Sequence, residues 1–525
     1  MESSTGIRWR RLGGGLSPIQ TKKKCEVEKT NVEEEEEPLS PSARLFHEPN
    51  FNVHILGIMG GKARMSPQII KEKLVHTLLK HPRFSSLLVV DEKTGDMKWV
   101  RTKVDINQHV IIPDLDSNYM ESPDKFVEDY VYNLSKSSLD KSKPLWELHL
   151  LNVKTSDAEG VGVFRIHHSL GDGTSLISLL LACTRQVSDP DKLPTIPGQN
   201  KKMNGTTTNY SSSGRSKPGL ISLKHYFVAV WLFIQLIWNT IKDVVMFGAT
   251  ALFLKDTETP IKARPGSEYS PRRVVYRIVS LDDMKLVKNA MNMASKFNFN
   301  HTINDVALGV TQAGLSRYLN RRYAELGKKD KGETEKRNNL PKNVRLRSTI
   351  LINLRPSAGI QALSDMMEKD TEAKWGNWIG SVLLPFKIAL RDDPLDYVRE
   401  AKATIDRKKN SLEAVYTFSI AGLVLKFFGI KKSSDLSHRV ISHTTMCFSN
   451  LIGPQEEIGF YGHPIAYIAP SSYGQPHGLV LNFESYVNKM TMVLSVDESV
   501  IPDPHQLLDD LQVSLNLIKD AALAI

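Results

Sequence analysis

The side chains best suited to chemistry in this sequence lie in one short run, His167-His168-Ser-Leu-Gly-Asp172-Gly173. A histidine followed four residues later by a carboxylate supplies a general base and a group that can orient it. A His–Asp pair also occurs as a purely structural contact, so both interpretations are open. The doubled histidine together with Asp-Gly favours the catalytic interpretation, with His168 as the base.

The residues around this run predict a tight turn between a strand and a helix. Residues 161–166 are apolar and rich in β-branched side chains, which is typical of a strand. Residues 174–182 form an apolar run of helix-forming leucines. Glycines permit such a turn, and Asp172 or Thr174 can cap the helix. In α/β proteins, sites lie at the carboxyl ends of strands, where this turn would present a histidine.

Short β-like runs and amphipathic helices interleave in both halves of the chain. This predicts an α/β (α+β) fold with two sheet-bearing lobes. The predicted strands are residues 53–58, 86–90, 146–153, 161–166, 273–279, 346–354, 380–386, 444–449, 478–486 and 491–496. The predicted helices are residues 67–80, 122–139, 174–182, 281–297, 302–323 and 504–524.

Composition divides the chain of 525 residues into segments. Charge segregation between Lys22–Lys24 and Glu33–Glu37 predicts a disordered tail, and no signal peptide is expected in it. The predicted segments are a tail at 1–37, an N-terminal lobe at 38–195, a flexible linker at 196–220, an apolar membrane-associated helical segment at 221–255, and a C-terminal lobe at 268–525.

The apolar segment is ambiguous in its relation to a membrane. Residues 226–241 would rise only about 24 Å as a helix, which is less than the roughly 30 Å of a hydrocarbon core. Gln235, Asn239, Lys242 and Asp243 share one helical face. This pattern favours a helix that lies in the membrane interface or packs on the protein, with a spanning helix and an ordinary buried helix as alternatives.

The formal net charge of +10 favours anionic partners such as a membrane face, a phosphorylated cofactor or nucleic acid. Zinc-finger spacing and aromatic-flanked basic patches do not occur in the sequence, so we expect no nucleic acid partner. The three cysteines, Cys25, Cys183 and Cys447, do not form a disulfide framework and suit a reducing compartment. A thiolate zinc site is not expected either, because the sequence has no Cys-x-x-Cys pair.

Four short blocks in the second half stand out, although each alone fits ordinary turn or capping chemistry. They are Asn304-Asp305 at the start of a long helix, Asn353-Leu-Arg-Pro356, Gly376-Asn-Trp-Ile-Gly380 and Ser449-Asn-Leu-Ile-Gly-Pro454.

Taken in order, these blocks resemble those of the plant wax ester synthase/diacylglycerol acyltransferase family. The run from His167 to Gly173 resembles the active-site motif of that family, and Pro144-Leu-Trp146 resembles an element upstream of it. The resemblance extends from about Pro38 to the C-terminus. Plant acyltransferases of soluble metabolites carry an Asp-Phe-Gly-Trp-Gly block that this chain lacks. Condensation domains share the doubled histidine but need carrier-protein partners, to which nothing in the sequence points.

The resemblance implies two chloramphenicol-acetyltransferase-like lobes with mixed sheets and an active-site tunnel between them. His168 would be the general base in the tunnel, and His167 would support it. Asp172 would orient the turn, with Arg355 as a candidate partner, and Gly173 would leave room for substrate. Asn304 and Asp305 would be an oxyanion-stabilising or structural pair.

The implied reaction is transfer of a long-chain acyl group from acyl-CoA to a long-chain fatty alcohol, giving a wax ester. Diacylglycerol is the second expected acceptor, giving triacylglycerol. No metal or other cofactor is expected beyond acyl-CoA as substrate. The expected location is the endoplasmic reticulum membrane, with the plasma membrane second, and a membrane surface is an expected partner. The alternative is a lipid-binding or regulatory protein with little activity on the same scaffold.

Overall fold

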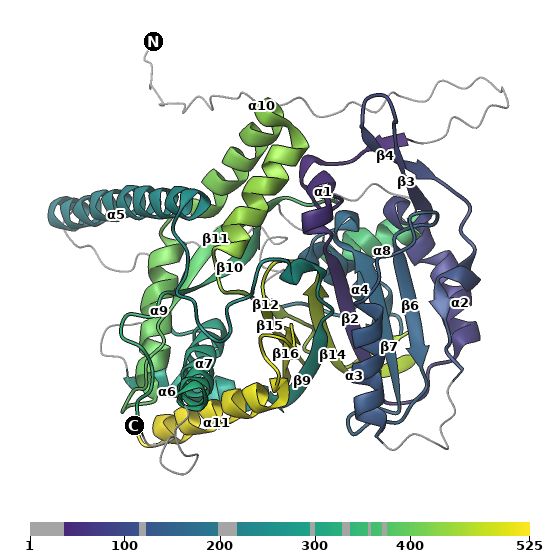
Figure 1. Cartoon of the computed structure of the whole chain (residues 1–525). Coiled ribbons are helices and arrows are strands. Elements are labelled where there is room, and N and C mark those ends of the chain that lie inside the picture. The colour runs from purple at the N-terminus through teal and green to yellow at the C-terminus, as the bar shows by residue number, and fades with distance from the viewer. Residues whose placement is uncertain are drawn as a thin grey trace. The chain divides into compact units, whose positions relative to one another are not determined.

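Two large mixed β-sheets dominate the described part of the chain (Figure 1). The computed structural model describes residues 36–114, 122–197, 218–294, 300–327, 337–354, 359–369 and 375–525, with the backbone alone for 218–225. Residues 36–525 form one compact unit. The α/β class with mixed sheets is confirmed.

The first large sheet has seven strands, with β2 (His54–Gly61) hydrogen-bonded to both β7 and β14. Its neighbours are antiparallel except for the parallel pair β5–β6. The order is β5 (Val110–Ile111), β6 (Trp146–Leu151), β7 (Gly160–His167), β2, β14 (His463–Tyr473), β13 (Ile458–Phe460) and β8 (Thr184–Gln186).

The second large sheet has six strands, with β12 (Met446–Ile452) running parallel to both of its neighbours. The other pairs are antiparallel. The order is β11 (Ile379–Phe386), β10 (Leu346–Asn353), β12, β15 (Leu479–Tyr486), β16 (Lys489–Val496) and β9 (Arg273–Ser280). A small sheet joins β1 (Glu36–Pro38), β4 (Met97–Arg101) and β3 (Ser86–Val90).

The predicted lobe boundaries are wrong at two places. Strands β13 and β14 belong to the second half of the sequence, yet they pair within the seven-stranded sheet. Helix α8 (Gly359–Lys369) also buries Leu363 and Met367 in the core beside that sheet. Backbone hydrogen bonding along β2 and burial of apolar side chains hold these segments there.

The predicted tail at 1–37 is too long by two residues, because Glu36 and Glu37 belong to β1. Glu37 Oε2 accepts a hydrogen bond of 3.0 Å from Nε of the buried Arg83. Residues 1–35 lie outside the described residues, as do 198–217 of the predicted linker.

The helices follow the predicted positions in most cases, although the sequence did not predict α1, α8, α9 or α10. The strands that the sequence did not predict are short or pair with distant parts of the chain, and local periodicity is a weak signal for such strands. The helices are α1 (Pro41–Leu45), α2 (Pro67–His76), α3 (Pro123–Leu134), α4 (Gly173–Ala182), α5 (Pro218–Leu252), α6 (Leu281–Ala294), α7 (Ile303–Leu326), α8, α9 (Leu395–Lys409), α10 (Glu413–Ser442) and α11 (Pro504–Leu523).

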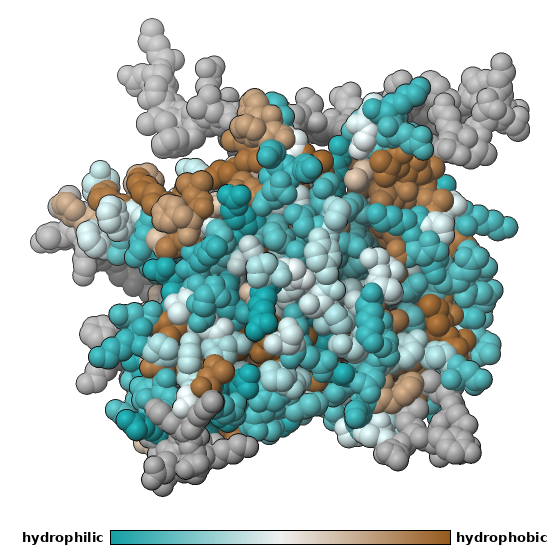
Figure 2. Space-filling model, viewed as in Figure 1, coloured by the Kyte–Doolittle hydropathy of each residue, from teal (hydrophilic) through white to brown (hydrophobic). Residues whose placement is uncertain are grey.

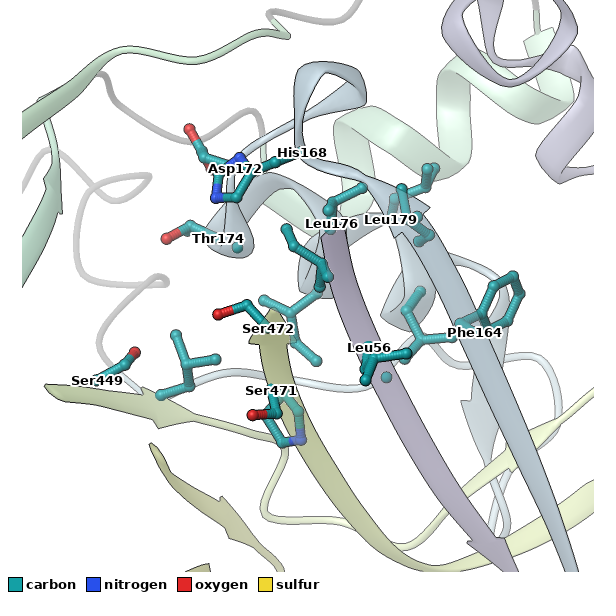
Figure 3. A pocket seen from close by; sticks show the side chains of 18 of the residues that line it. Leu56, Phe164, His168, Asp172, Thr174, Leu176, Leu179, Ser449, Ser471 and Ser472 are labelled. Atoms are coloured by element: carbon teal, nitrogen blue, oxygen red, sulfur yellow. The ribbon is translucent and has the colours of Figure 1, made fainter. Parts of the chain in front are cut away.

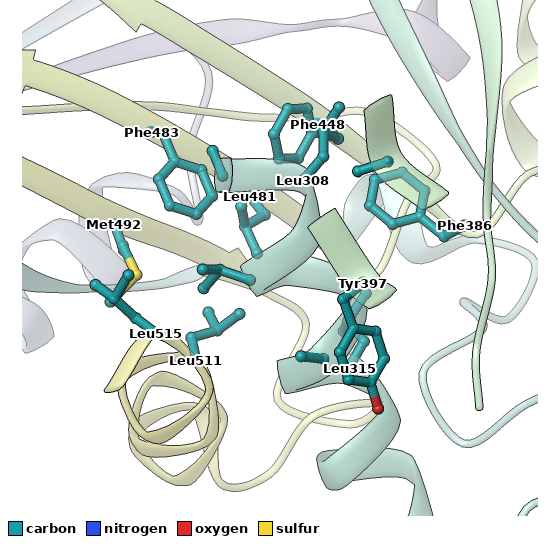
Figure 4. Packing of buried hydrophobic residues seen from close by; sticks show 14 of the residues in the cluster. Leu308, Leu315, Phe386, Tyr397, Phe448, Leu481, Phe483, Met492, Leu511 and Leu515 are labelled. Atoms are coloured by element: carbon teal, nitrogen blue, oxygen red, sulfur yellow. The ribbon is translucent and has the colours of Figure 1, made fainter. Parts of the chain in front are cut away.

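Helix α7 runs through the larger hydrophobic core, between the six-stranded sheet and helices α9 and α11 (Figure 4). Two glycines permit this close packing. A Cβ on Gly309 would lie 3.0 Å from Val398 Cα, and a Cβ on Gly314 would lie 3.1 Å from Leu511 Cα. Most of the helix is therefore buried all round, which accounts for its lack of a single apolar stripe.

Helix α5 contacts the protein through Asn239 and Asp243 of its predicted polar face, and its first part leaves apolar side chains exposed. Asn239 Nδ2 donates to the carbonyl of Asn410 at 3.1 Å, and Asp243 pairs with Arg407 and Lys408 at 2.8 and 2.9 Å. Residues 226–234 are exposed on every side. The alternative of an ordinary buried helix is therefore wrong for this part of the segment.

Candidate functional site

The predicted turn lies between β7 and α4 and is fixed by three backbone contacts. After His167, residues 168–170 form one turn of 3₁₀-helix, and α4 begins at Gly173. Asp172 is the N-cap of α4, and its Oδ1 accepts a hydrogen bond of 2.8 Å from the Ser175 amide. The His168 amide donates to Val53 O, and Asn377 Nδ2 donates to His168 O, both at 3.0 Å. Both the strand-to-helix turn and the Asp172 cap are confirmed.

His168 is a buried, neutral histidine on the wall of a cavity. Its side chain stacks on Phe46 with ring centroids 4.2 Å apart. Burial lowers the pKa of His168 from 6.5 to about 4, and its own backbone carbonyl opposes this shift. The imidazole is therefore uncharged at pH 7 and has a lone pair that can accept a proton.

His167 has a different environment, in which both ring nitrogens have partners. Its Nδ1 accepts from the Ser169 amide at 3.3 Å, and its Nε2 lies 2.9 Å from Asn52 Oδ1. The ring stacks on His47 with centroids 4.3 Å apart, and burial holds the pKa of His167 well below its ordinary value. It does not line the cavity, so its geometry is that of a support for the turn.

The cavity has a volume of about 200 Å³ and a mostly apolar lining drawn from both sheets. Figure 3 shows His168, Asp172 and Thr174 together, with Leu176, Leu179, Leu56 and Phe164 along one side. Leu351, Ile379 and Leu451 line it from the six-stranded sheet. The cavity can therefore hold an apolar chain with one reactive end near His168.

Gly173 lines this cavity at the first residue of α4. A Cβ built on Gly173 meets no protein atom within 4 Å. A side chain at this position would therefore project into space that a substrate could otherwise use.

Asn304 and Asp305 do not line the cavity, in contrast to the predicted role of Asn304 in stabilising an oxyanion. Asn304 Oδ1 accepts a hydrogen bond of 3.1 Å from Asn450 Nδ2. Asp305 forms a capping box with Thr302, the N-cap of α7, whose amide donates to Asp305 Oδ2 at 2.8 Å. The structural interpretation of this pair is therefore the one that the geometry supports.

Polar side chains that the sequence did not single out line the cavity instead. Ser471 and Ser472 come from β14, and no sequence pattern marked them. Ser449 comes from β12 and begins the fourth block, whose sequence alone fits ordinary turn chemistry. Asn482 Nδ2 donates to Ser471 Oγ at 3.2 Å. These groups line the same cavity as His168, whereas Asn304 does not.

Comparison with known proteins identifies the family. The model of the wax ester synthase/diacylglycerol acyltransferase catalytic domain matches residues 48–307, and that of the WS/DGAT C-terminal domain matches residues 375–519. The chain belongs to the wax ester synthase/diacylglycerol acyltransferase family.

Individual relatives agree with this assignment. The chain is 51% identical to wax ester synthase/diacylglycerol acyltransferase 5 of Arabidopsis thaliana over 98% of each chain. It is also 51% identical to wax ester synthase/diacylglycerol acyltransferase 11 of the same plant, over 93% of this chain and 96% of the relative. As a member of this family, the protein is an O-acyltransferase.

Solved structures share the fold at low sequence identity. The wax ester synthase/diacylglycerol acyltransferase of Marinobacter aquaeolei VT8 aligns with a TM-score of 0.54 at 16% identity, over 92% of this chain and 99% of that one. A trichothecene 15-O-acetyltransferase from Fusarium sporotrichioides aligns with a TM-score of 0.51 at 12% identity, over 92% of this chain and 95% of that one.

In this acyltransferase, three of the four second-half blocks contribute to the site. Asn353 and Ser449 line the cavity, and Asn377 fixes the backbone of His168. Arg355, the predicted partner of Asp172, lies outside the described residues. Among the described residues, no group of three or more His, Cys, Asp or Glu side chains is arranged to hold a metal ion.

Proposed function

We propose that this acyltransferase transfers a long-chain acyl group from acyl-CoA to a long-chain fatty alcohol or to diacylglycerol, with His168 as general base. The observation that carries the proposal is a neutral histidine on the wall of an apolar cavity. The names of the relatives support both acceptors, which give wax ester and triacylglycerol respectively.

His168 takes the proton from the acceptor hydroxyl as the oxygen attacks the thioester carbonyl of acyl-CoA. The tetrahedral intermediate collapses, the C–S bond breaks, and the imidazolium returns the proton to the CoA sulfur. An alcohol is a poor nucleophile at neutral pH, so the positioned base supplies the main activation. The apolar lining excludes water and thereby disfavours hydrolysis of the thioester.

Asp172 acts on this reaction through the turn, because it caps α4 and thereby fixes the residues next to His168. The oxyanion receives its hydrogen bonds from hydroxyl groups that line the cavity, for which Ser449 and Ser472 are the candidates. Gly173 leaves space for the substrate.

The reaction takes place at a membrane surface, and we place the protein at the endoplasmic reticulum, with the plasma membrane second. Its substrates are apolar and concentrate in bilayers. Two helices of the described chain, residues 226–252 and α10, are long and apolar enough to cross a membrane, and only 11% of the apolar window of each is buried. This exposure supports a lipid partner for the protein.

The test is to incubate the full chain with labelled palmitoyl-CoA and either hexadecanol or diacylglycerol. We expect labelled wax ester in the first reaction and triacylglycerol in the second, and neither product with the His168→Ala variant. Binding of palmitoyl-CoA without turnover on either acceptor would instead establish the lipid-binding alternative. Full activity of His168→Ala would refute the role of His168.

A further inference from the structure

Helix α10 is a helical hairpin, because its path reverses at Gly429. This glycine has φ 76° and ψ 178°, which is outside the helical region. Figure 1 shows two arms that meet at the labelled end of α10. We call residues 413–442 the α10 hairpin and residues 426–432 its tip.

The two ends of the α10 hairpin are fixed on the protein, and its tip is free of it. Glu413 and Thr417 are buried in the first arm, and Ser434 and Val440 are buried in the second. Phe427 and Phe428, at the tip, are 70% and 69% exposed. Because both ends are buried on the protein, the tip projects from the protein body as an ordered part of the structure.

The tip combines exposed aromatic rings with positive charge. Its sequence is Lys426-Phe-Phe-Gly-Ile-Lys431-Lys432, and all three lysines are exposed. Aromatic side chains beside lysines are typical of segments that lie at the boundary between head groups and acyl chains. Lysines near an anionic membrane also add electrostatic attraction.

The exposed part of α5 continues this surface. Figure 2 shows hydrophobic side chains gathered over α5 and α10, and these two helices contact each other. The large apolar side chains that are exposed here include Tyr226, Phe227, Val228, Trp231, Leu232, Phe233, Ile234, Ile237, Trp238, Leu423, Phe427 and Phe428. Such an area exceeds what a soluble surface ordinarily leaves uncovered.

The second end of the α10 hairpin packs beside His168, and the first packs on a strand that lines the cavity. In the second arm, Ile441 packs on the cluster of Phe46, Phe51 and Val53, and Phe46 stacks on His168. The first arm contacts β11, where a Cβ on Gly380 would lie 2.3 Å from Ala414 O. The neighbouring Ile379 lines the cavity.

We propose that the tip of the α10 hairpin enters one leaflet of an anionic bilayer, while α5 lies beside it in the interface. The hairpin is then a monotopic anchor, and it directs the His168 end of the cavity toward the lipid that supplies the acyl acceptor. The arms, residues 413–428 and 430–442, rise roughly 24 and 20 Å, and both ends are fixed on the protein, so the hairpin does not span the membrane. This inference rests on the proposed acyl transfer to membrane lipids.

The direct test places an environment-sensitive nitrobenzoxadiazole label at the tip of the full chain. Cys25→Ser/Phe428→Cys carries the label, since Cys183 and Cys447 lie in environments that raise the pKa of their thiols to about 11 and 12 and slow labelling. Cys25→Ser/Met293→Cys is the matched control, because Met293 is 82% exposed on α6, outside the surface proposed to bind lipid.

With vesicles of phosphatidylcholine and phosphatidylserine, we expect a blue shift at position 428 and quenching by lipids that carry a nitroxide. The label at 293 should show neither change. An unchanged spectrum at 428 would overturn the proposal. A shift without vesicles that grows with protein concentration would overturn it as well, because it would identify a second copy of the chain as the occupant.

Two further variants separate charge from apolar insertion and both from catalysis. Lys426→Gln/Lys431→Gln/Lys432→Gln should weaken vesicle binding about fivefold for each lysine, and only when phosphatidylserine is present. Phe427→Asp/Phe428→Asp should lower turnover of hexadecanol in vesicles about tenfold, while turnover of detergent-dispersed hexadecanol stays unchanged. If no ester forms in either medium, the proposed function fails, and the label still decides the question of insertion.

Discussion

The turn that holds His168 and the start of α7 are built alike but differ in what lies next to them. Each is a helix N-terminus capped by a side chain, Asp172 in one and Thr302 with Asp305 in the other. The first adjoins the cavity, whereas the second is closed by its own capping box and by the Asn304–Asn450 hydrogen bond. A capped helix N-terminus can therefore take part in chemistry only where a cavity lies beside it, and the capping pattern alone does not indicate such a role.

The largest expected effect distinguishes the two histidines of the turn. His168→Ala should lower kcat by about 10³-fold or more, because it removes the proposed base, while thermal unfolding stays close to that of the parent. His167→Ala should mainly lower the melting temperature, since it leaves Asn52 and Ser169 without their ring partner. Equal losses of kcat in these two variants would contradict the assignment.

The next effect compares two serine hydroxyls that line the cavity with the side-chain amide of Asn304 at the start of α7. Ser449→Ala/Ser472→Ala should lower kcat by about 10²-fold, as expected when donors to an oxyanion are removed. Asn304→Ala should leave kcat within about threefold, because the amide does not line the cavity. Steady-state kinetics on hexadecanol measure both variants, and the reverse result would restore the predicted role of Asn304.

Lowering the pH should destabilise the fold through the buried histidines in and near the turn. Burial lowers the pKa of His47 and of His54 to about 3 and that of His168 to about 4, against 6.5 in the unfolded chain. The unfolded state therefore binds more protons below pH 6.5. The contribution of these histidines to the free energy of unfolding is constant above pH 6.5. It falls as the pH drops toward their pKa values in the folded state, by up to about 1.4 kcal/mol per pH unit for each histidine.

Urea unfolding from pH 7.5 to 5 measures how the free energy of unfolding depends on pH. The His54→Phe variant is compared with the parent protein. A phenyl ring preserves the stacking of this residue on Tyr473, where the ring centroids lie 4.8 Å apart. The variant should flatten the slope by about 1.4 kcal/mol per pH unit. An unaltered slope would show that His54 does not contribute to it.

The smallest effect compares the two capping carboxylates. Asp172→Ala and Asp305→Ala should each lower the free energy of unfolding by about 0.5–2 kcal/mol, because Asp172 is the N-cap of α4 and Asp305 completes the capping box of α7. Only Asp172→Ala should also lower kcat, since its cap adjoins His168. Loss of activity in Asp305→Ala at a temperature where it is fully folded would break the distinction between the two regions.

Much of the fold could be predicted from local pattern. The short apolar run at 86–90 predicted β3, and the helices predicted at 302–323 and 504–524 match α7 and α11 within a few residues. The turn at His167–Gly173 and its Asp172 cap were predictable because glycines and a capping side chain act on their immediate neighbours.

The sequence by itself therefore determined many of the elements and the turn that presents His168, the proposed base. Tertiary structure alone decided that β14 completes the N-terminal sheet, that Ser471 and Ser472 reach the cavity and that Asn304 does not. It also decided that α10 folds back at Gly429 and leaves its tip exposed. Local patterns fix backbone conformation, whereas strand pairing and cavity lining depend on contacts between residues far apart in the chain, which no local spacing encodes.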